Sequence, residues 1–590
     1  MAQISRCFDL LDFYRTSFGN KPDMYGAKVA GKWTTWSTDE AIGIITDLCS
    51  GLINAGVKKG ERVGIMAANR PEWNFADFAI QLCGAVSVPV YPNLSEQDLA
   101  FVVKDAGLVA FFTDTKALAD KVSLGAQQAG ASIKVFTFDK AEGYTQYTTL
   151  VEDGKKNPQT AVIEEVKKNT SDDTLLTLLY TSGTTGTPKG VMLTHANLVQ
   201  NFTILCDLPP VDHTSRALSF LPLNHIYERM LSYLYLFRGP SIYYAESIEK
   251  VGDNIRELQP HMFTCVPRLV EKVFDRIMAK GEELTGIKRK LFYWAVELGE
   301  QYDIPEKRSG WYNFKLSIAS ALVFKKWREA LGGNVRAMVS GGAALNVRLA
   351  KIFWAAGIPV LEGYGLTETS PVIAVNTLEP GNMYFGTVGP VVRNGTVKFG
   401  PDGEILFKGP NVMKGYWNRP DATAEVMDAD GFFHTGDIGE LVNGKYLKIT
   451  DRKKEIFKTS QGKYIAPQRI ENMLCASRFI EQAMVIGEGE KFAAAIIVPA
   501  FSFVREWAKR KGIDVGSTPA EIASNKDVRS RIFKDVEIAN KSLANYEQIR
   551  KIMLIDRPFS VETGELTPKL SLKRKVVLKN YEVKITDLFA

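Results

Sequence analysis

The sequence has few groups that could cross-link the chain or hold a transition metal. Its six cysteines are widely scattered and form no CxxC pair, which indicates reduced thiols and neither a disulfide framework nor a zinc site. Its five histidines show no HExxH or comparable ligand spacing. We therefore expect no bound transition metal and a cytoplasmic protein.

Long apolar runs and charge of one sign are also missing. The chain has no span of about 18 uninterrupted apolar residues, and its first segment, MAQISRCFDLLDFYR, lacks the basic and apolar regions of a secretory signal. The net charge of +6 is weak for 590 residues, and basic residues are interleaved with acidic ones. Nucleic acid is therefore not an expected partner, and any membrane association is expected to be peripheral.

The length of the chain exceeds that of one compact core, so we expect at least two domains. Short apolar runs alternate with amphipathic segments, which predicts α/β layers with parallel sheets. Strand-like runs broken by Gly and Asp in residues 402–417 and 431–450 predict a small antiparallel unit. A helix, strand and helix pattern follows a charged run, so we expect an N-terminal domain of residues 1–450 and a compact α+β domain of residues 451–590.

Basic and aromatic side chains are interleaved in residues 277–330. They are Lys288, Arg289, Lys290, Lys325, Lys326 and Arg328, with Phe292, Trp294, Trp311, Phe314 and Trp327. One interpretation is a membrane-facing patch. The other, which the frequency of amphipathic helices favours, is a helical hairpin whose aromatics pack inward while its lysines are solvated.

The strongest chemical signal is a stretch rich in glycine and hydroxyl groups, YTSGTTGTPKG, at residues 180–190. It follows a strand-like run, so its backbone N–H groups can surround phosphates, while its hydroxyls and Lys189 add donors and positive charge. Its spacing does not fit the Walker A motif. Taken alone, the stretch predicts a phosphate site, with a surface loop as the alternative.

This stretch resembles the signature of the AMP-forming acyl-adenylate superfamily, which includes acyl-CoA synthetases, luciferases and the adenylation domains of peptide synthetases. Four further segments match that family in the expected order: LPLNHIYER (221–229), EGYGLTETSP (362–371), HTGDIG (434–439) and DRKKEIFKTSQGKYIAP (451–467). The resemblance covers nearly the whole chain. It implies a large N-terminal domain of several subdomains and a small, mobile C-terminal domain.

The resemblance implies an ATP site. Tyr364 would stack on adenine, and Thr367 would donate a hydrogen bond to the α-phosphate. Glu368, with Thr181, would hold Mg²⁺, a hard cation suited to carboxylate and phosphate oxygens; the alternative for Glu368 is a buried structural role. The other residues implied to line this site are Ser182, Gly183, Thr184, Thr185, Gly186, Gly342, Ala343, Glu362, Gly363 and Gly365.

Ribose and acyl contacts also follow from the resemblance. Asp437 would accept hydrogen bonds from both ribose hydroxyls, and Arg452 would reach the same sugar. Alone, Asp437 could equally be a turn residue. His225 would line the path to the reacting carboxylate, where the alternative is a core histidine.

The implied chemistry consists of two displacements. A carboxylate attacks the α-phosphorus of ATP and pyrophosphate leaves; a thiol then attacks the acyl-adenylate and AMP departs. The C-terminal domain of this family rotates about a hinge between the two steps, and closure excludes water from the labile mixed anhydride. Asp451 matches the hinge position, and Lys458 matches a lysine associated with thioester formation.

One departure from the family concerns the lysine of the adenylation step. Long-chain members usually have a sequence like TPTLKLKR, whereas this chain has TPKLSLKR at residues 567–574. Ser571 therefore takes the place of the catalytic lysine. Lys569 and Lys573 lie two residues to either side, and we favour Lys569 because Lys573 matches a lysine that the family already has.

The acid substrate is inferred from the resemblance alone. The run at residues 261–277 and the ER of LPLNHIYER are similar to the long-chain fatty acyl-CoA synthetase branch. The expected activity is that of a long-chain fatty acid:CoA ligase using ATP, a fatty acid and CoA. The alternatives are a fatty acyl-AMP ligase that delivers to a carrier-protein thiol, and a catalytically weak relative that binds nucleotide or fatty acid.

Overall fold

A computed structural model describes residues 4–182, 187–304, 307–560, 562–566 and 572–590 of the chain. Contacts divide the chain into two compact units, each described here by itself. The first unit contains residues 1–341, 349–397 and 407–433, and the second contains residues 342–348, 398–406 and 434–590. The mixed α/β class expected from the sequence is confirmed.

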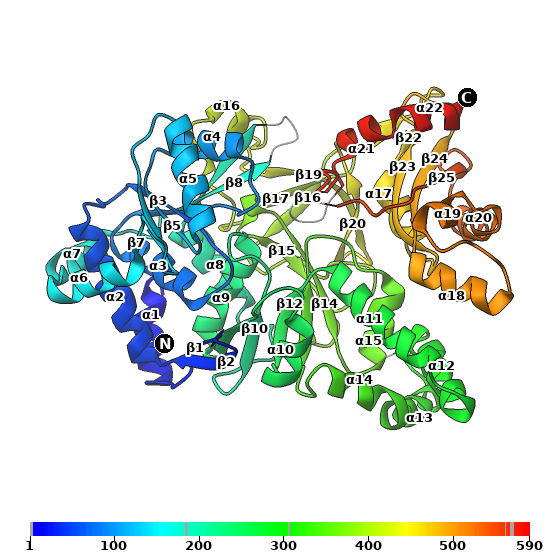
Figure 1. Cartoon of the computed structure of the whole chain (residues 1–590), viewed down its shortest axis with the longest axis horizontal. Helices are drawn as coiled ribbons and strands as arrows, with labels where there is room; N and C mark the ends of the chain where they lie inside the picture. The colour runs from blue at the N-terminus through cyan, green and yellow to red at the C-terminus, as the bar shows by residue number, and fades with distance from the viewer. Residues whose placement is uncertain (1–3, 183–186, 305–306, 561, 567–571) are drawn as a thin grey trace. The chain divides into compact units, whose positions relative to one another are not determined.

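One eight-stranded sheet of the first unit has the order β18–β9–β8–β4–β3–β5–β6–β7. Its strands β3, β5, β7 and β8 are labelled in Figure 1. Its strands are parallel from β8 to β7, and β9 and β18 extend one edge in antiparallel fashion. The central strands are mostly apolar because both of their faces are buried, with Arg62 and Ser87 as the polar residues of β3 and β4. The bounds are β3 (Arg62–Met66), β4 (Val86–Pro89), β5 (Leu108–Thr113), β6 (Lys134–Thr137), β7 (Thr145–Gln146), β8 (Leu175–Ser182), β9 (Pro188–Thr194) and β18 (Gly415–Tyr416).

A second eight-stranded sheet of this unit has the order β15–β14–β13–β12–β10–β11–β1–β2. It is parallel from β14 to β1, and only its edge strands β15 and β2 are antiparallel to their neighbours. The bounds are β1 (Tyr25–Val29), β2 (Lys32–Trp36), β10 (Arg216–Ser219), β11 (Ser241–Tyr244), β12 (Met262–Cys265), β13 (Ala337–Ser340), β14 (Val360–Gly365) and β15 (Val372–Val375).

Helix α3 (Pro71–Leu82) is buried along its whole length. It contacts β3 and β4 of the first sheet and β1 of the second, so it lies between the two sheets. Helix α9 (Ile226–Arg238) is also almost entirely buried and packs against α8 (His195–Leu205). The other helices before residue 430 are α1 (Asp9–Phe18), α2 (Thr38–Asn54), α4 (Glu96–Ala106), α5 (Lys116–Gln128), α6 (Tyr147–Lys156), α7 (Thr160–Asn169), α10 (Val251–Leu258), α11 (Pro267–Glu282), α12 (Gly286–Glu300), α13 (Gly310–Ala319), α14 (Lys325–Ala330), α15 (Val347–Ala355) and α16 (Pro420–Ala424).

A buried ion pair joins these inner elements. The Arg229 guanidinium on α9 lies 2.5 Å from Asp77 on α3, and neither side chain is more than 1% exposed. Arg229 also donates to the hydroxyls of Tyr233 (3.0 Å) and Thr177 (2.7 Å), and Thr177 donates in turn to the carbonyl of Ser87. The network therefore ties α9 to α3 and to strands β8 and β4.

Helices α11 to α14 lie in this part of the chain, as both interpretations require, but its aromatics divide between two environments. Phe292 and Trp327 are buried and pack against each other. Trp311 and Phe314 on α13 are instead 65% and 55% exposed. The expectation that the aromatics pack inward is wrong for these two residues, because α13 contacts α12 through residues such as Tyr312, whose hydroxyl donates to the Leu298 carbonyl at 2.8 Å.

The second unit contains a three-stranded sheet in the order β23–β24–β25. Alternate residues of its strands face two separate clusters: Ala483 and Val485 pack beneath α17, α18 and α20, while Met484 and Ile486 pack beneath α21. The strands are β23 (Ile480–Ile486), β24 (Ala493–Pro499) and β25 (Ile549–Leu554). The helices are α17 (Pro467–Leu474), α18 (Phe501–Lys511), α19 (Pro519–Ser524), α20 (Lys526–Asn540), α21 (Arg574–Asn580) and α22 (Glu582–Phe589).

The predicted antiparallel unit corresponds to a four-stranded sheet in the order β16–β17–β19–β20, within which β19 and β20 are antiparallel. A short pair, β21 and β22, follows it. The bounds are β16 (Thr396–Phe399), β17 (Glu404–Lys408), β19 (Phe433–Val442), β20 (Tyr446–Arg452), β21 (Phe457–Lys458) and β22 (Tyr464–Ile465).

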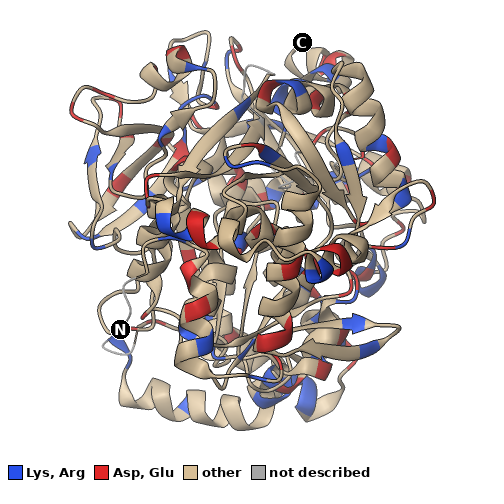
Figure 2. Cartoon of the chain, turned by 90° about the vertical axis from the view of Figure 1, so that its left-hand side faces the viewer, with Lys and Arg blue, Asp and Glu red and all other residues tan. Residues whose placement is uncertain are grey.

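Basic and acidic residues are interleaved along the ribbon in Figure 2, as the sequence indicates. Within the described residues, no helix combines the length and the apolar character needed to cross a membrane.

Replacing Arg229 by Met should lower the free energy of unfolding by about 3–5 kcal/mol, because it leaves the Asp77 carboxylate buried without a counter-charge. The double variant Arg229→Met/Asp77→Leu should recover much of this loss. Urea denaturation followed by circular dichroism measures both. Lys414→Met is the control, since its ion pair with Asp173 is exposed and should contribute little. If Arg229→Met were as stable as the wild type, the Arg229–Asp77 ion pair would not have the stabilising role assigned to it.

Candidate active site

The glycine-rich stretch connects two antiparallel strands of the first sheet. Thr181 at the end of β8 is opposite Lys189 in β9, and Ser182 is opposite Pro188. The intervening site candidates Gly183, Thr184, Thr185 and Gly186 lie outside the described residues. The predicted strand before the stretch is present as β8, and after the stretch the chain continues as the antiparallel strand β9.

Lys189 and Glu368 are connected through a tyrosine that the sequence interpretation missed. The Tyr416 hydroxyl donates to the Glu368 carboxylate at 2.9 Å, and the Lys189 ammonium lies 5.1 Å from the centroid of the Tyr416 ring. Burial, together with the nearby Glu368 carboxylate, raises the pKa of Tyr416, so the hydroxyl remains a donor at neutral pH. The structure therefore brings together a predicted phosphate residue and a predicted magnesium ligand.

The segment EGYGLTETSP begins in β14 and ends in a short 3₁₀ turn at Thr367–Thr369. Glu362 and Thr367 are mostly buried, whereas Tyr364 is half-buried. Gly365 cannot be replaced here, because a Cβ would lie 1.8 Å from the carbonyl oxygen of Pro371. This close approach ends the strand and brings Thr367 and Glu368 into the turn.

His225 is the N-cap of α9. Its Nδ1 accepts a hydrogen bond from the backbone N–H of Tyr227 at 3.1 Å, which satisfies one of the unpaired donors at the start of the helix. In the neutral imidazole the proton is therefore on Nε2. The half-buried ring is fixed in orientation by the helix that it caps.

Glu228, three residues further along α9, is a buried acid without a cationic partner among its described interactions. Its carboxylate accepts a hydrogen bond from the Thr264 hydroxyl at 2.5 Å. Burial raises the pKa of Glu228 to about 7, while hydrogen bonds from Ser219 and Thr264 limit the rise. The sequence interpretation used Glu228 only as a family marker and missed its burial.

Asp437 and Arg452 are paired within the second unit. They are directly opposite each other on β19 and β20, and the Arg452 Nε lies 3.6 Å from the Asp437 carboxylate. Asp437 is mostly buried, whereas about half of the Arg452 side chain is exposed. The antiparallel register thus brings together the two residues that the sequence assigns to ribose.

Glu404 contacts the part of β19 that precedes Asp437, and the sequence interpretation missed it. Its carboxylate lies 2.7 Å from the Lys453 ammonium and accepts a hydrogen bond from the backbone N–H of Gly436 at 2.9 Å. His434 lies 3.4 Å from the same carboxylate. Because Glu404 is 30 residues away from His434 in the chain, no local motif could have indicated this contact.

The predicted hinge residue, Asp451, is buried at the end of β20. One carboxylate oxygen accepts a hydrogen bond from the Arg452 backbone N–H at 2.6 Å, and the other has no hydrogen-bond partner in the described part of the chain. Burial raises the pKa of Asp451 to about 6, and Glu455 and Glu471 add to the rise.

The remaining predicted site residues are distributed over three segments. Lys458 is exposed on β21, with its ammonium 5.4 Å from the Tyr464 ring. Gly342 and Ala343 are exposed in a turn, where Gly342 has a left-handed φ of +83° that glycine adopts without strain. Lys569 and Ser571 lie outside the described residues.

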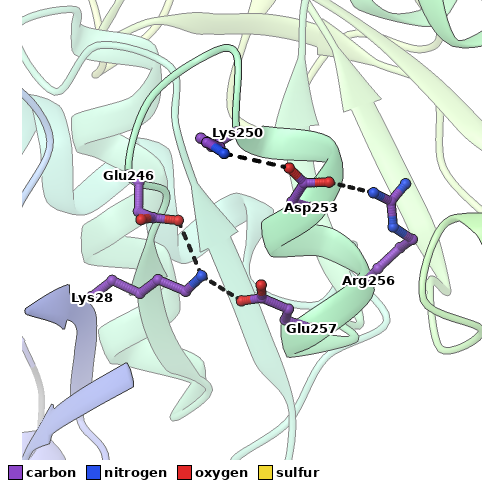
Figure 3. Close-up of a pocket in the computed structure, with 6 residues that line it drawn as sticks. All are labelled: Lys28, Glu246, Lys250, Asp253, Arg256 and Glu257. Atoms are coloured by element: carbon purple, nitrogen blue, oxygen red, sulfur yellow. Dashed lines mark hydrogen bonds and ion pairs between the residues drawn. The ribbon is translucent and has the colours of Figure 1, made fainter. Parts of the chain in front are cut away.

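A charged surface pocket in the first unit involves none of the predicted site residues (Figure 3). Lys28 pairs with Glu246 and Glu257 at 3.1 and 2.6 Å, while Lys250 and Arg256 both pair with Asp253. The six charged side chains that line the pocket therefore neutralise one another. This arrangement indicates a surface ion-pair cluster.

Comparisons with known proteins agree with this geometry. The AMP-binding enzyme family matches residues 16–417, and its C-terminal domain family matches residues 454–590. A long-chain-fatty-acid–CoA ligase of Mycobacterium bovis is 34% identical over 571 residues, covering 96% of this chain and 94% of that protein. Long-chain-fatty-acid–CoA ligase 1 of Homo sapiens is 34% identical, covering 92% and 80%.

Solved structures show the same fold at lower identity. The adenylation domain of a carboxylate reductase from Mycobacterium chelonae superimposes with a TM-score of 0.75 at 21% identity, covering 100% of this chain and 92% of that one. A fatty acyl CoA synthetase of Mycobacterium tuberculosis gives a TM-score of 0.64 at 20% identity, with coverage of 98% and 99%.

The family models and the full-length relatives identify an AMP-forming ligase. The chain belongs to the AMP-binding enzyme family, and its sequence resemblance to the AMP-forming acyl-adenylate superfamily is confirmed.

Glu228→Gln should change how stability depends on pH. Because the folded-state pKa of Glu228 is about 7 against an ordinary value of 4.5, the unfolded chain loses this proton first as pH rises. The wild type should therefore lose stability relative to the variant between about pH 4.5 and 7, by about 1.4 kcal/mol for each unit of pKa shift.

Urea midpoints of the wild type and Glu228→Gln at pH 4.5, 6 and 8 measure this difference. Glu440→Gln, at an exposed position paired with Lys448, is the control and should show no comparable trend. A constant difference between the wild type and Glu228→Gln across this range would show that folding does not raise the pKa of Glu228.

Proposed function

We propose that the protein is a long-chain fatty acid:CoA ligase, which activates a fatty acid with ATP to an acyl-adenylate and transfers the acyl group to CoA. Its relatives named long-chain-fatty-acid–CoA ligases match nearly the whole chain at 34% identity. The observation that carries the proposal within this structure is the connection of Lys189, Tyr416 and Glu368, which supports a site for triphosphate.

The nucleotide roles are proposed residue by residue. In the first unit, Tyr364 stacks on adenine, while Thr181, Thr367 and Lys189 contact the phosphates. The half-buried position of Tyr364 and the turn that contains Thr367 support these roles. In the second unit, Asp437 binds the ribose, and its pairing with Arg452 supports the assignment of both residues to this sugar.

The donor set fits Mg²⁺ held jointly with ATP. No cluster of three or more His, Cys, Asp or Glu side chains that could hold a metal occurs among the described residues. Mg²⁺ commonly uses only one or two protein carboxylates together with substrate phosphates and water. Glu368 would supply the carboxylate and Thr181 a hydroxyl, and the ion would offset phosphate charge when it is bound.

The two displacements require charge stabilisation and exclusion of water. Lys189 would balance negative charge that develops on the phosphates as pyrophosphate leaves. His225, with its Nε2 as donor, would lie on the acyl side and orient the carboxylate. We propose a C-terminal domain of residues 451–590 that rotates about Asp451 between the half-reactions, so that Lys569 serves adenylation and Lys458 serves thioester formation.

The first experiment measures pyrophosphate release by the purified protein with Mg·ATP and saturated acids of increasing length, with and without CoA. Release should depend on a long-chain acid, and acyl-CoA should appear once CoA is present. Glu368→Gln should slow release, whereas Glu379→Gln, at an exposed position, should not.

Two results would contradict this function. The absence of pyrophosphate release with every acid would favour a relative that only binds nucleotide or fatty acid. Release without acyl-CoA, with transfer only to a carrier-protein thiol, would favour a fatty acyl-AMP ligase.

The role of Lys569 is tested by separating the half-reactions. Lys569→Ala should slow acyl-adenylate formation by a factor of about 10²–10³, the usual cost of removing one group that stabilises transition-state charge. It should leave thioester formation from supplied acyl-adenylate nearly unchanged, and Lys458→Ala should do the reverse.

Lys573→Ala is the matched control, because this lysine lies on the other side of Ser571. A larger loss of adenylation in Lys573→Ala than in Lys569→Ala would assign the role to Lys573 instead. The variant Ser571→Lys should restore adenylation to Lys569→Ala if the position, rather than the particular residue, determines the rate.

A further inference from the structure

Four exposed apolar side chains form a row along α13 and the π-helical turn that follows it, Ser320–Phe324. Trp311, Phe314, Ile318 and Leu322 are 65%, 55%, 37% and 54% exposed. Their spacing of three and four residues puts them on one side of the helix. We call this row the apolar stripe. Single exposed apolar residues are ordinary, but a contiguous row indicates a contact surface.

The members of the stripe lie together. The rings of Trp311 and Phe314 are stacked, with their centroids 5.5 Å apart and their planes within 20°. Val323, Phe324 and Trp327 face the other way and are buried. The helix therefore presents one apolar face to the protein and another to its surroundings.

Basic residues predominate along this segment, and Glu329, directly after it, pairs with Lys325 at 4.0 Å. From residue 307 to residue 328 the sequence has six basic residues and no Asp or Glu, the basic residues being Lys307, Arg308, Lys315, Lys325, Lys326 and Arg328. The Lys315 ammonium lies 5.3 Å from the Trp311 ring. This segment thus departs from the mixed charge of the rest of the chain.

The start of α12 also combines an exposed apolar side chain with neighbouring basic residues. Ile287 is 76% exposed and is followed directly by Lys288, Arg289 and Lys290. Helix α12 packs against α13, so the two helices belong to the same corner of the first unit (Figure 1).

We propose that the apolar stripe and its lysines form a docking surface for an anionic lipid bilayer. Helices with Trp, Phe and Leu on one face and with lysines beside them lie in the interface between headgroups and acyl chains. Exposed lysines gain attraction to anionic headgroups, and Trp is favoured at interfacial depth. The inference rests on the proposed function in one respect: a fatty acid substrate would partition into such a bilayer.

The charge on this segment favours a bilayer over a second copy of the chain. Two identical stripes facing each other would bring Lys315, Lys325 and Lys326 of both copies close together, six lysines against the two copies of Glu329. Like charges in that arrangement repel, whereas an anionic bilayer complements them.

Vesicle sedimentation with the full chain tests the proposal. Vesicles of phosphatidylcholine mixed with phosphatidylglycerol should bind the protein, and pure phosphatidylcholine vesicles should bind it much less. Trp311→Ser/Phe314→Ser and Lys325→Glu/Lys326→Glu should each weaken binding about tenfold or more.

Matched variants control for general changes in polarity and charge. Ile248→Ser removes another exposed apolar residue of the same unit (69% exposed), and Lys155→Glu/Lys156→Glu reverses another exposed lysine pair. Both should bind vesicles like the wild type. Equal binding by all variants, or no binding to either kind of vesicle, would overturn the proposal.

Two further measurements separate this inference from the enzymatic function. Acyl-CoA formation from a long-chain acid supplied on albumin, without vesicles, should be the same for stripe variants and wild type. Loss of vesicle binding with unchanged activity supports the docking surface, while normal binding without activity contradicts only the proposed function. Sedimentation velocity that shows dimers dispersed by Trp311→Ser/Phe314→Ser would assign the stripe to self-association and overturn membrane docking.

Discussion

The buried guanidinium of Arg229 is the constraint on which the interior of the first unit depends. It lies on α9, pairs with Asp77 on α3 and donates to Thr177 on β8. Helix α9 is capped by His225, which we propose to lie on the acyl side, and β8 ends within the glycine-rich stretch. The planar guanidinium of arginine can donate to several acceptors at once in fixed directions. Arg229 therefore fixes α9, which carries the proposed acyl-side residue, relative to β8, which leads into the proposed phosphate site.

The sequence pattern predicted the strand before the glycine-rich stretch, which occurs as β8. The family resemblance assigned Asp437 and Arg452 to the same ribose; these residues are opposite each other on β19 and β20, and the ribose assignment itself stays a prediction. The return of the chain as β9 was not predicted, because the residues after Lys189 are compatible with either strand or helix until their partner strand is known. Short apolar runs have this ambiguity in general.

Contacts between distant segments could not be predicted. Tyr416 is 48 residues from Glu368, and Glu404 is 30 residues from His434; in both cases a residue of one motif is held by a residue outside every motif. The burial of aromatics in α13 was also undetermined. A helical period shows which side chains share a face, but which face is covered depends on the neighbouring elements, and here that neighbour leaves Trp311 in solvent.

Adjacent residues of α9 show two solutions to the burial of charge. Arg229 retains its charge because a carboxylate and two hydroxyls replace its water. Glu228, about 100° further round the helix, is offered hydroxyl donors alone, and burial raises the pKa of its carboxyl to about 7. An ionised Glu228 would cancel part of the field of the neighbouring guanidinium while gaining no cation of its own. Helix α9 therefore buries one permanent charge, on Arg229, and one carboxyl, on Glu228, that titrates near neutrality. Of the two, only Arg229 keeps its charge, and so its contacts with α3 and β8, on both sides of neutral pH.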